Sequence, residues 1–378
     1  MRRKNDLGRD PIGQLVLKIA LPSMLAQFVS VLYSIVDRIY ISNIPLTGET
    51  ALAGVGVCGP VVTMLGAFAF LVGVGGAPLM SINMGAGRPE EARRILSNSF
   101  LVLCVCALVL TAAVYPLRRP MLMFFGASDV TYPYAEEYFS IYLAGTAFNL
   151  LSLGMNQFII SQGFAKKGMF SVVLGAALNI VLDPLFIFVF DMGVAGAALS
   201  TLLSRFCAMA FLLVRLSVKD SELRLRLRNM IPDLSVIRKI LYIGLPSCFE
   251  NSLFQLGRIL VVIIITGFGT AQIAANAIAN NLDSFGCIPG KGLQLAVITV
   301  VGQCVGAQMK DEAYFYARKL MKIAYALTAV ANILVMATLP LTVPIYNVSA
   351  EAQHLAIILV LIHTAFAIIL WPSAFVMP

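Results

Sequence analysis

Two acidic residues lie inside apolar stretches of the sequence, where charged side chains are rare. Asp37 falls within LAQFVSVLYSIVDRIYIS and Asp183 within LGAALNIVLDPLFIFVF. A carboxylate at the depth of a lipid bilayer costs roughly 2.5 to 3.5 kcal/mol even on lenient insertion scales, so such residues usually face a protein cavity. The two acids therefore predict a site that takes part in moving ions or substrate across a membrane.

Oxygen-bearing side chains accompany both acids at helical spacing. Tyr33 precedes Asp37 by four residues, and Asn179 precedes Asp183 by four, so each pair shares one face of a helix. Carboxylate, amide and hydroxyl oxygens suit a hard cation such as Na⁺. Two neighbouring carboxylates equally suit a proton, because their like charges favour protonation of one of them. The residue types leave both Na⁺ and H⁺ open.

The composition indicates a membrane protein. The chain of 378 residues is 59% hydrophobic and 12% charged, with a mean hydropathy of +0.88, whereas soluble domains carry about 25% charged residues. The net charge of +8 resides in short loops and forms no motif for nucleic acid, so we expect no nucleic-acid partner. The seven cysteines are scattered without metal-ligand spacing. We expect them to be buried thiols, and we expect no metal site and no cofactor.

Ten apolar stretches are long enough for membrane-spanning helices. We expect these helices at about 13–42, 51–84, 94–116, 133–161, 167–190, 194–218, 237–266, 271–303, 314–344 and 351–378. Most basic residues lie at the N-terminus or in the loops after even-numbered helices, whereas Arg118 and Arg119 lie on the opposite side. This asymmetry predicts a multi-pass protein of the cytoplasmic (plasma or inner) membrane with a cytoplasmic N-terminus.

The two halves of the sequence resemble each other. KIALPSMLAQ (18–27) matches YIGLPSCFEN (242–251), and SINMGAGRPEEAR (81–93) matches VGQCVGAQMKDEA (301–313). Six helices separate each matching pair, so the repeats share one orientation in the membrane, an architecture that some transporters use. The expected division is an N-terminal six-helix lobe at 1–218, a cytoplasmic linker at 219–236 and a C-terminal lobe at 237–378.

Several stretches together carry a resemblance to a known family. They are LYSIVDRIYIS (32–42), LNIVLDPLFIF (178–188), GVAGAALSTLLS (193–204), MGAGRPEEA (84–92) and IGLPS (243–247). The chain resembles the MATE (multidrug and toxic compound extrusion) transporters, in their DinF-like prokaryotic branch. The resemblance implies an all-α polytopic membrane protein with two lobes of parallel six-helix repeats. Since that plan has twelve helices, we expect the last two to be missing and the C-terminal lobe to be incomplete; a true ten-helix protein is the alternative.

The resemblance also implies a cation-coupling site in the N-terminal lobe. The positions that match the family's site residues are Tyr33, Asp37, Asn156, Asn179, Asp183 and Thr201. Pro22 marks a bend in the first helix that either changes with the ion load or is static. Glu250 in the seventh helix is a possible second coupling acid, although it lies about one turn closer to the proline than in the relatives that use such a residue.

Other charged residues fall within the expected helices. Arg38 follows Asp37, and adjacent side chains point about 100° apart on a helix, so Arg38 either neutralises Asp37, pairs elsewhere or reaches the outer interface. We expect Asp283 and Lys291 to form an internal charge pair or to lie at the ends of a kinked helix, with a substrate role as the alternative. We expect Arg205 to serve packing or the membrane interface.

The resemblance implies a secondary antiporter, not an enzyme, that exports organic cations, drugs or toxic metabolites in exchange for Na⁺ or H⁺. An amphipathic small molecule would bind through aromatic and Met contacts in a central cavity, and the protein would act as a monomer in the lipid bilayer. CIPGKG (287–292) lacks the first Gly and the Ser or Thr of a nucleotide-binding P-loop, so ATP is not expected to drive transport. One alternative is a flippase for a lipid-linked saccharide or cell-wall precursor. Another is a lipid-modifying membrane enzyme, for which the sequence offers no nucleophile or metal cluster.

Overall fold

The computed structural model describes residues 16–218, 223–225, 231–346 and 349–376. Most of the basic N-terminal segment and part of the expected linker 219–236 lie outside these residues. Twelve α-helices form the described part of the chain: α2 (Leu21–Ser42), α3 (Gly48–Gly85), α4 (Pro89–Phe124), α5 (Tyr132–Ala144), α6 (Thr146–Ser161), α7 (Ala165–Pro184), α8 (Gly193–Ser217), α9 (Leu234–Thr266), α10 (Thr270–Gly286), α11 (Ile288–Gly306), α12 (Lys310–Thr342) and α13 (Ala350–Val376). Three short helical turns adjoin them: η1 (Val16–Ala20), η2 (Leu185–Val189) and η4 (Val343–Tyr346).

The helices are long and apolar enough for repeated membrane crossing. Among the described residues, eight helices pass this test of length and composition, or nine if the bent pair α5 and α6 is one span. The prediction of an all-α, multi-pass membrane protein is therefore confirmed.

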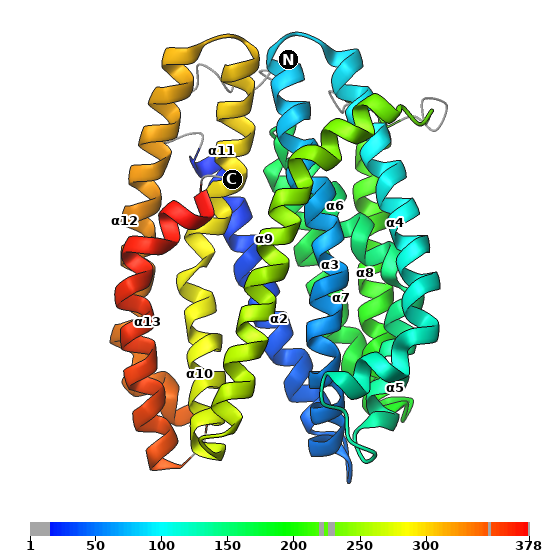
Figure 1. The fold of residues 1–378 in the computed structure, drawn as a ribbon, viewed down its shortest axis with the longest axis vertical. Coiled ribbons are helices and arrows are strands. Elements are labelled where there is room, and N and C mark those ends of the chain that lie inside the picture. The colour runs from blue at the N-terminus through cyan, green and yellow to red at the C-terminus, as the bar shows by residue number, and fades with distance from the viewer. Residues whose placement is uncertain (1–15, 219–222, 226–230, 347–348, 377–378) are drawn as a thin grey trace.

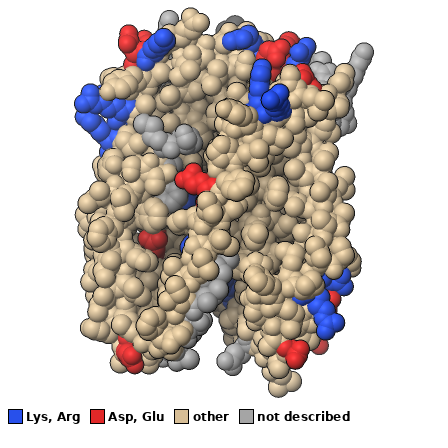
Figure 2. Space-filling view, viewed as in Figure 1, with Lys and Arg blue, Asp and Glu red and all other residues tan. Residues whose placement is uncertain are grey.

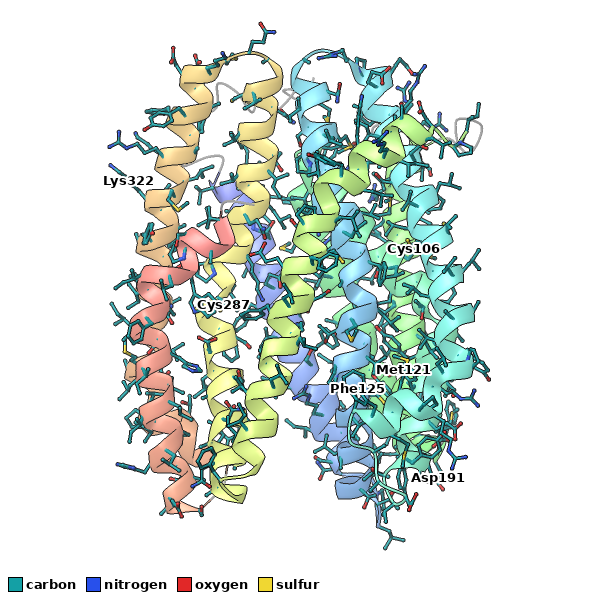
Figure 3. The ribbon with its side chains drawn as sticks, viewed as in Figure 1. Cys106, Met121, Phe125, Asp191, Cys287 and Lys322 are labelled. Carbon is teal, nitrogen blue, oxygen red and sulfur yellow. The ribbon has the colours of Figure 1, made fainter. Side chains whose placement is uncertain are left out.

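Two of the expected helices are broken. The stretch 133–161 forms α5 and α6, which meet at Gly145 with a bend of 58°. The stretch 271–303 is divided at Cys287, and Pro289 lies in the first turn of the helix that follows (Figure 3). Proline has no N–H to continue the preceding helix, and glycine tolerates backbone conformations that other residues avoid. A hydropathy pattern is blind to such breaks because the apolar run continues through them.

The helices form two bundles that meet along a central junction. Figure 1 shows α3 to α8 together on one side, which we call the first bundle, and α10 to α13 on the other, which we call the second bundle. The helices α2 and α9 run along the junction between them. α3 packs against α9 and α11, and α2 packs against α7 and α11. Helices from the two halves of the sequence therefore share one interface.

The bundles approach most closely where α3 and α11 end. A Cβ atom added at Gly85 would lie 2.0 Å from the carbonyl oxygen of Gln303, and one at Gly306 would lie 1.9 Å from that of Ile82. Positions 85 and 306 differ by 221, as do 82 and 303, so these contacts are reciprocal between matching positions of the repeat. Small residues permit such close backbone packing of membrane helices, and the contacts show the pseudo-two-fold relation that the repeat predicts.

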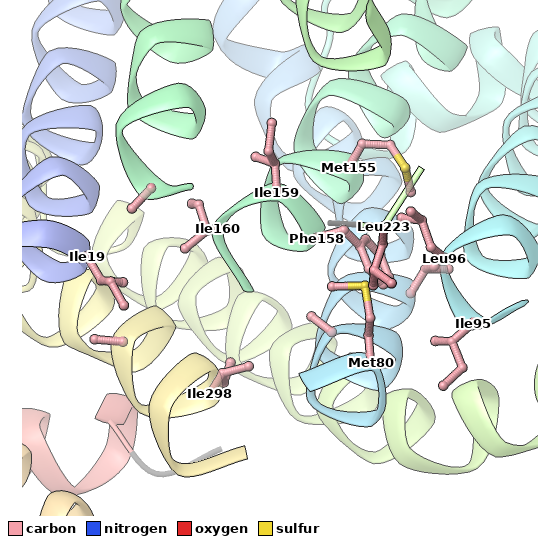
Figure 4. Packing of buried hydrophobic residues seen from close by; sticks show 14 of the residues in the cluster. Ile19, Met80, Ile95, Leu96, Met155, Phe158, Ile159, Ile160, Leu223 and Ile298 are labelled. Carbon is pink, nitrogen blue, oxygen red and sulfur yellow. The ribbon is translucent and has the colours of Figure 1, made fainter. Parts of the chain in front are cut away.

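A buried apolar cluster lies next to these contacts. Phe158 on α6 packs with Met80 on α3 and Leu96 on α4, all three fully buried, and Ile298 on α11 joins the cluster from the other bundle (Figure 4). Lipid tails are as apolar as these side chains, so in a membrane the cluster stabilises the fold chiefly through close van der Waals packing.

Basic side chains gather at one end of the molecule, as Figure 2 shows. Arg88 and Arg94 lie at the turn between α3 and α4, and Lys310 lies at the turn between α11 and α12. We call this the basic end. Lys322 on α12 points outward nearer to this end than to the other (Figure 3). The glycine contacts of α3 and α11 therefore close the junction at the basic end.

Candidate functional site

Asp183 and Asn179 form a buried hydrogen-bonded cluster between α7 and α8. Asp183 is fully buried and Asn179 is 2% exposed. The Asn179 amide nitrogen donates to Asp183 Oδ1 at 3.3 Å and reaches Ser200 Oγ at 3.1 Å and Thr201 Oγ1 at 3.3 Å. Ser200 Oγ also donates to Asp183 Oδ1. The cluster holds one carboxylate oxygen of Asp183 firmly and leaves the other without a donor.

Asp37 on α2 completes this cluster from the junction side. Its carboxyl group lies within hydrogen-bonding reach of that of Asp183. Three buried oxygens have no donor among the described residues: Asp37 Oδ1, Asp183 Oδ2 and Asn179 Oδ1. Buried acceptors are rarely left unpaired, and two adjacent carboxylates repel each other strongly in a low-dielectric interior. The arrangement is therefore suited to take up a proton or a small cation.

Tyr33 belongs to a different interaction. Its hydroxyl accepts a hydrogen bond from an Arg205 guanidinium nitrogen at 2.5 Å, and the guanidinium lies 5.6 Å from the centre of the Tyr33 ring. Arg205, which we expected to serve packing or the membrane interface, reaches across from α8 to α2 within the bundle. The structure thus separates Tyr33 from the hydrogen bonds around Asp183.

A small cavity lies between these two groups. It has a volume of about 40 Å³, and its walls include Tyr33, Asn156, Asn179, Thr201 and Arg205. Asn156 Oδ1 is buried without a hydrogen-bond donor among the described residues. Such a volume holds a water molecule or a bare ion but no organic substrate. Five of the six expected site residues therefore face one another across the cavity or bond within the cluster beside it, and Asp37 joins through Asp183.

A second, larger cavity opens between α2 and α10, on the side of the junction away from the basic end. Its volume is about 450 Å³, within the range of organic ligand sites. We call it the cleft, and its polar walls are Ser30, Ser34, Arg38 and Ser42 of α2, Asn281 and Ser284 of α10, and Tyr346. Figure 2 shows a hollow along the junction in which basic and acidic atoms are visible. The cleft contains few of the aromatic and Met side chains that the sequence led us to expect.

The charges of the second bundle gather around Asp283 on α10. His363, Arg258 and Lys291 all lie near enough to exert electrostatic effects on Asp283. Arg258 on α9 also donates to Asn280 Oδ1 at 3.2 Å. The expected Asp283–Lys291 pairing is therefore one part of a cluster in which positive groups outnumber the acid.

Glu250 and Pro22 lie apart from the buried acids. Glu250 is exposed on α9 and has no hydrogen bond or ion pair with another described residue. Pro22 is buried in the first turn of α2, directly after the wider turn η1. Because η1 and α2 continue as one span, Lys18–Ser42, Pro22 removes a backbone hydrogen bond within a continuous helix. The wider turn η1 lies directly before this position.

The structure adds two residues to the site, Ser200 and Arg205. Arg205 follows Thr201 by four residues, so its helical spacing from an expected site residue was a usable signal. Ser200 has no such signal, because its role depends on how α7 and α8 pack. Among the described residues, no group of three or more His, Cys, Asp or Glu side chains could hold a metal ion, and the seven cysteines are free thiols.

Comparison with known proteins identifies relatives over most of the chain. The MatE family model matches residues 22–185 and 246–376. The multidrug export protein MepA of Staphylococcus haemolyticus is 26% identical over 290 residues, which cover 77% of this chain and 64% of MepA. The probable multidrug resistance protein NorM of Thermotoga maritima is 27% identical over 82% of this chain and 67% of its own length. A FAD transporter of Shewanella oneidensis is 24% identical over 83% and 70% of the two chains.

Solved structures share the fold over the length of this chain. A MATE structure in complex with MaD5 superposes with a TM-score of 0.89 at 25% identity, covering 100% of this chain and 84% of that one. A transporter of the MOP superfamily from Pyrococcus furiosus, described by the reverse polarity of its binding pocket, superposes with a TM-score of 0.88 at 26% identity, covering 100% and 83%.

These superpositions correct one expectation. The sequence led us to expect a chain that lacks the last two helices of a 6+6 plan. Solved structures cover 100% of this chain, so truncation is not supported. That expectation rested only on comparing a count of apolar runs with an ideal twelve-helix plan.

Proposed function

Because the chain belongs to the MatE family, we propose that it is an ion-coupled antiporter that exports drugs or toxic metabolites across the cytoplasmic membrane. The observation that carries this proposal is the buried pair Asp37 and Asp183 with its unpaired oxygens. Relatives named as multidrug export proteins support the substrate class. Its relatives are transporters, so we do not expect enzymatic activity.

Coupling requires the acids to hold the driving ion in one state of the bundles and to lose it in the other. A ligand shifts such an equilibrium only by its difference in affinity for the two states. Asp37 lies on α2, which contacts both bundles, whereas Asp183 lies on α7 within one of them. Neutralising the pair with H⁺ or Na⁺ would therefore change the force on α2, and through α2 the closure of the cleft. Tyr33, Asn156, Asn179 and Thr201 would position the ion or the water around it.

The proposed orientation follows the distribution of charge. With the basic end in the cytoplasm, the glycine contacts close the cytoplasmic side and the cleft opens toward the outside. This arrangement agrees with an outward-open state from which substrate would leave. We propose that a monomer suffices, because both walls of the cleft come from one chain.

A flippase for a lipid-linked saccharide or cell-wall precursor is the second candidate. The arginines Arg38 and Arg205 in the walls of the two cavities favour it, because the phosphates of such a substrate are anionic. The two candidates differ in whether transport needs a lipid-linked substrate.

The test is transport by the purified chain in proteoliposomes. Ethidium movement should follow an imposed H⁺ or Na⁺ gradient, and Asp37→Asn and Asp183→Asn should each reduce gradient-driven transport at least about 100-fold, because an amide cannot exchange the ion. Asp129→Asn, in the exposed turn after α4, is the control and should transport normally. Full coupling in either buried variant would rule out the assigned site, and a gradient-independent movement of lipid-linked saccharide would favour the flippase.

A further inference from the structure

We propose that the cleft binds the anionic group of an amphipathic organic substrate and that Arg38 is the residue that receives it. The inference rests on the proposed export function and narrows its substrate class. The shared chemistry is a phosphate or similar anion, carried either by a soluble metabolite or by a lipid headgroup.

Arg38 has no hydrogen-bond or ion-pair partner among the residues that the structure describes. Its side chain is exposed and lines the cleft, and it makes no hydrogen bond or ion pair with the other described residues. The neighbouring Asp37 lies near enough to exert an electrostatic effect on Arg38, but its carboxyl group also lies beside that of Asp183, and no ion pair within 4 Å joins Asp37 to Arg38. An unpaired guanidinium in a membrane-spanning helix usually marks a substrate or ion pathway.

The other polar walls of the cleft are neutral. Ser34 and Ser284 donate their hydroxyl protons to backbone carbonyls, Ser30 and Asn280, at 2.9 and 2.8 Å. The Asn281 amide has no hydrogen bond to another described residue. Arg38 is thus the charged donor among these walls, Ser30, Asn281 and Tyr346 are neutral donors without a hydrogen bond to another described residue, and no acidic residue is among the walls. Donors without an opposing carboxylate suit an anion better than an organic cation.

Nearby charges do not reverse this polarity. Asp283 on α10 is accompanied by Arg258 and Lys291, so that wall carries no net negative charge. Glu250 lies on α9 about two helical turns from Arg258, toward the basic end. The small cavity beside Arg205 also has arginine as its charged wall residue, but at about 40 Å³ it is too small for a substrate.

An apolar surface lies between the same two helices. The rings of Phe28 on α2 and Phe285 on α10 are 6.0 Å apart at their centres, nearly three turns from Arg38 along α2. Aromatic rings in this arrangement offer a surface for the planar or apolar part of a ligand. An anion at Arg38 and Asn281 would then tie α2 to α10 while the cleft is open.

A matched pair of flavins tests the inference, because riboflavin and riboflavin 5′-phosphate differ only in a phosphate. With the purified chain at fixed ionic strength, we expect the phosphate form to bind at least about tenfold more tightly, since charge-assisted hydrogen bonds have that strength. Arg38→Gln should bring the two affinities close to equality, Asn281→Ala should reduce the difference, and Arg38→Lys should keep part of it. Arg119→Gln is the control, because Arg119 lies against Tyr132 and outside the cleft walls.

A second measurement separates the two sources of the anion. Proteoliposomes containing a fluorescent phosphatidic acid report movement of a lipid phosphate between leaflets. Arg38-dependent binding of the flavin phosphate supports a soluble substrate, and Arg38-dependent movement of the lipid supports a headgroup. Equal flavin affinities in the wild-type protein together with no Arg38-dependent movement of the lipid overturn the inference. Gradient-driven ethidium transport without either response would support the proposed antiport and contradict the anion site at Arg38. Arg38-dependent binding without gradient-driven transport would support the anion site and contradict the proposed antiport.

Discussion

The two bundles match where their backbones meet and differ where their polar side chains lie. At the basic end, Gly85 and Gly306 make reciprocal contacts that a two-fold relation requires. Between the first bundle and α2, Asp37 and Asp183 lie among neutral donors. Between the second bundle and α9, Asp283 lies among Arg258, Lys291 and His363. The two halves thus share the surfaces that contact each other and differ in their interiors, and the function proposed above places ion exchange at Asp37 and Asp183.

The largest expected effect on stability concerns the glycine contacts between α3 and α11. Gly85→Ala and Gly306→Ala should each destabilise the protein by about 1 to 3 kcal/mol, because the added methyl group would overlap a backbone oxygen that cannot move away alone. Gly56→Ala, in the same helix α3 but with open space at that position, should stabilise by up to about 1 kcal/mol through its better helix propensity. Thermal unfolding in detergent measures all three.

Reciprocity makes this prediction strict. Gly85→Ala and Gly306→Ala should lower the melting temperature by similar amounts and should weaken the α3–α11 contact at the basic end. Crosslinking of cysteine pairs introduced across that contact would detect the weakening. A large decrease in melting temperature for one variant and none for the other would mean that the α3–α11 contact is not two-fold, and the two bundles would then not match at their backbones.

The next prediction concerns the free energy of unfolding, which should change in opposite directions when Asp183 and Asp283 are each neutralised. At pH 8, Asp183→Asn should raise the free energy of unfolding by about 1 to 2 kcal/mol, because it removes repulsion with Asp37 while an amide oxygen can still accept from Ser200. Asp283→Asn should lower it by a similar amount, because positive neighbours lose their counter-charge. Unfolding curves for both variants, with Asp129→Asn as control, decide the point; destabilisation by both would show that the two acids have the same electrostatic setting.

The sequence was informative about the first bundle's acids and much less about their surroundings. Asp37 and Asp183 stand out because charge within apolar runs is unusual, and their spacing from Tyr33 and Asn179 follows from helix geometry alone. The structure shows that Asn179 bonds Asp183 but that Tyr33 bonds Arg205. Which of two partners a side chain selects depends on how helices rotate against each other, and local spacing does not encode that rotation.

The fold shows the same division. Apolar length predicted a polytopic helical protein, and internal similarity predicted the matching contacts of α3 and α11. The break at Gly145 was missed, because it interrupts the hydrogen bonding of the backbone without interrupting its hydrophobicity. The division at Cys287 was expected only as a kink between Asp283 and Lys291, as one of the alternatives. The mistaken expectation of missing helices shows the risk of comparing a count of apolar runs with an ideal plan.

The smallest expected effect on stability concerns the contact between Tyr33 on α2 and Arg205 on α8. Tyr33→Phe, Arg205→Met and the double variant form a cycle that isolates their mutual contribution to stability. We expect a coupling of about 0.5 to 1.5 kcal/mol, since a hydrogen bond and a ring contact join the pair. Tyr40→Phe is the control, because Tyr40 lies on the same helix, with its ring 6.3 Å from that of Phe188. Additive losses would show that Tyr33 is free to join the acids, as the sequence alone predicted, and the polar interior of the first bundle would then act as one group instead of two.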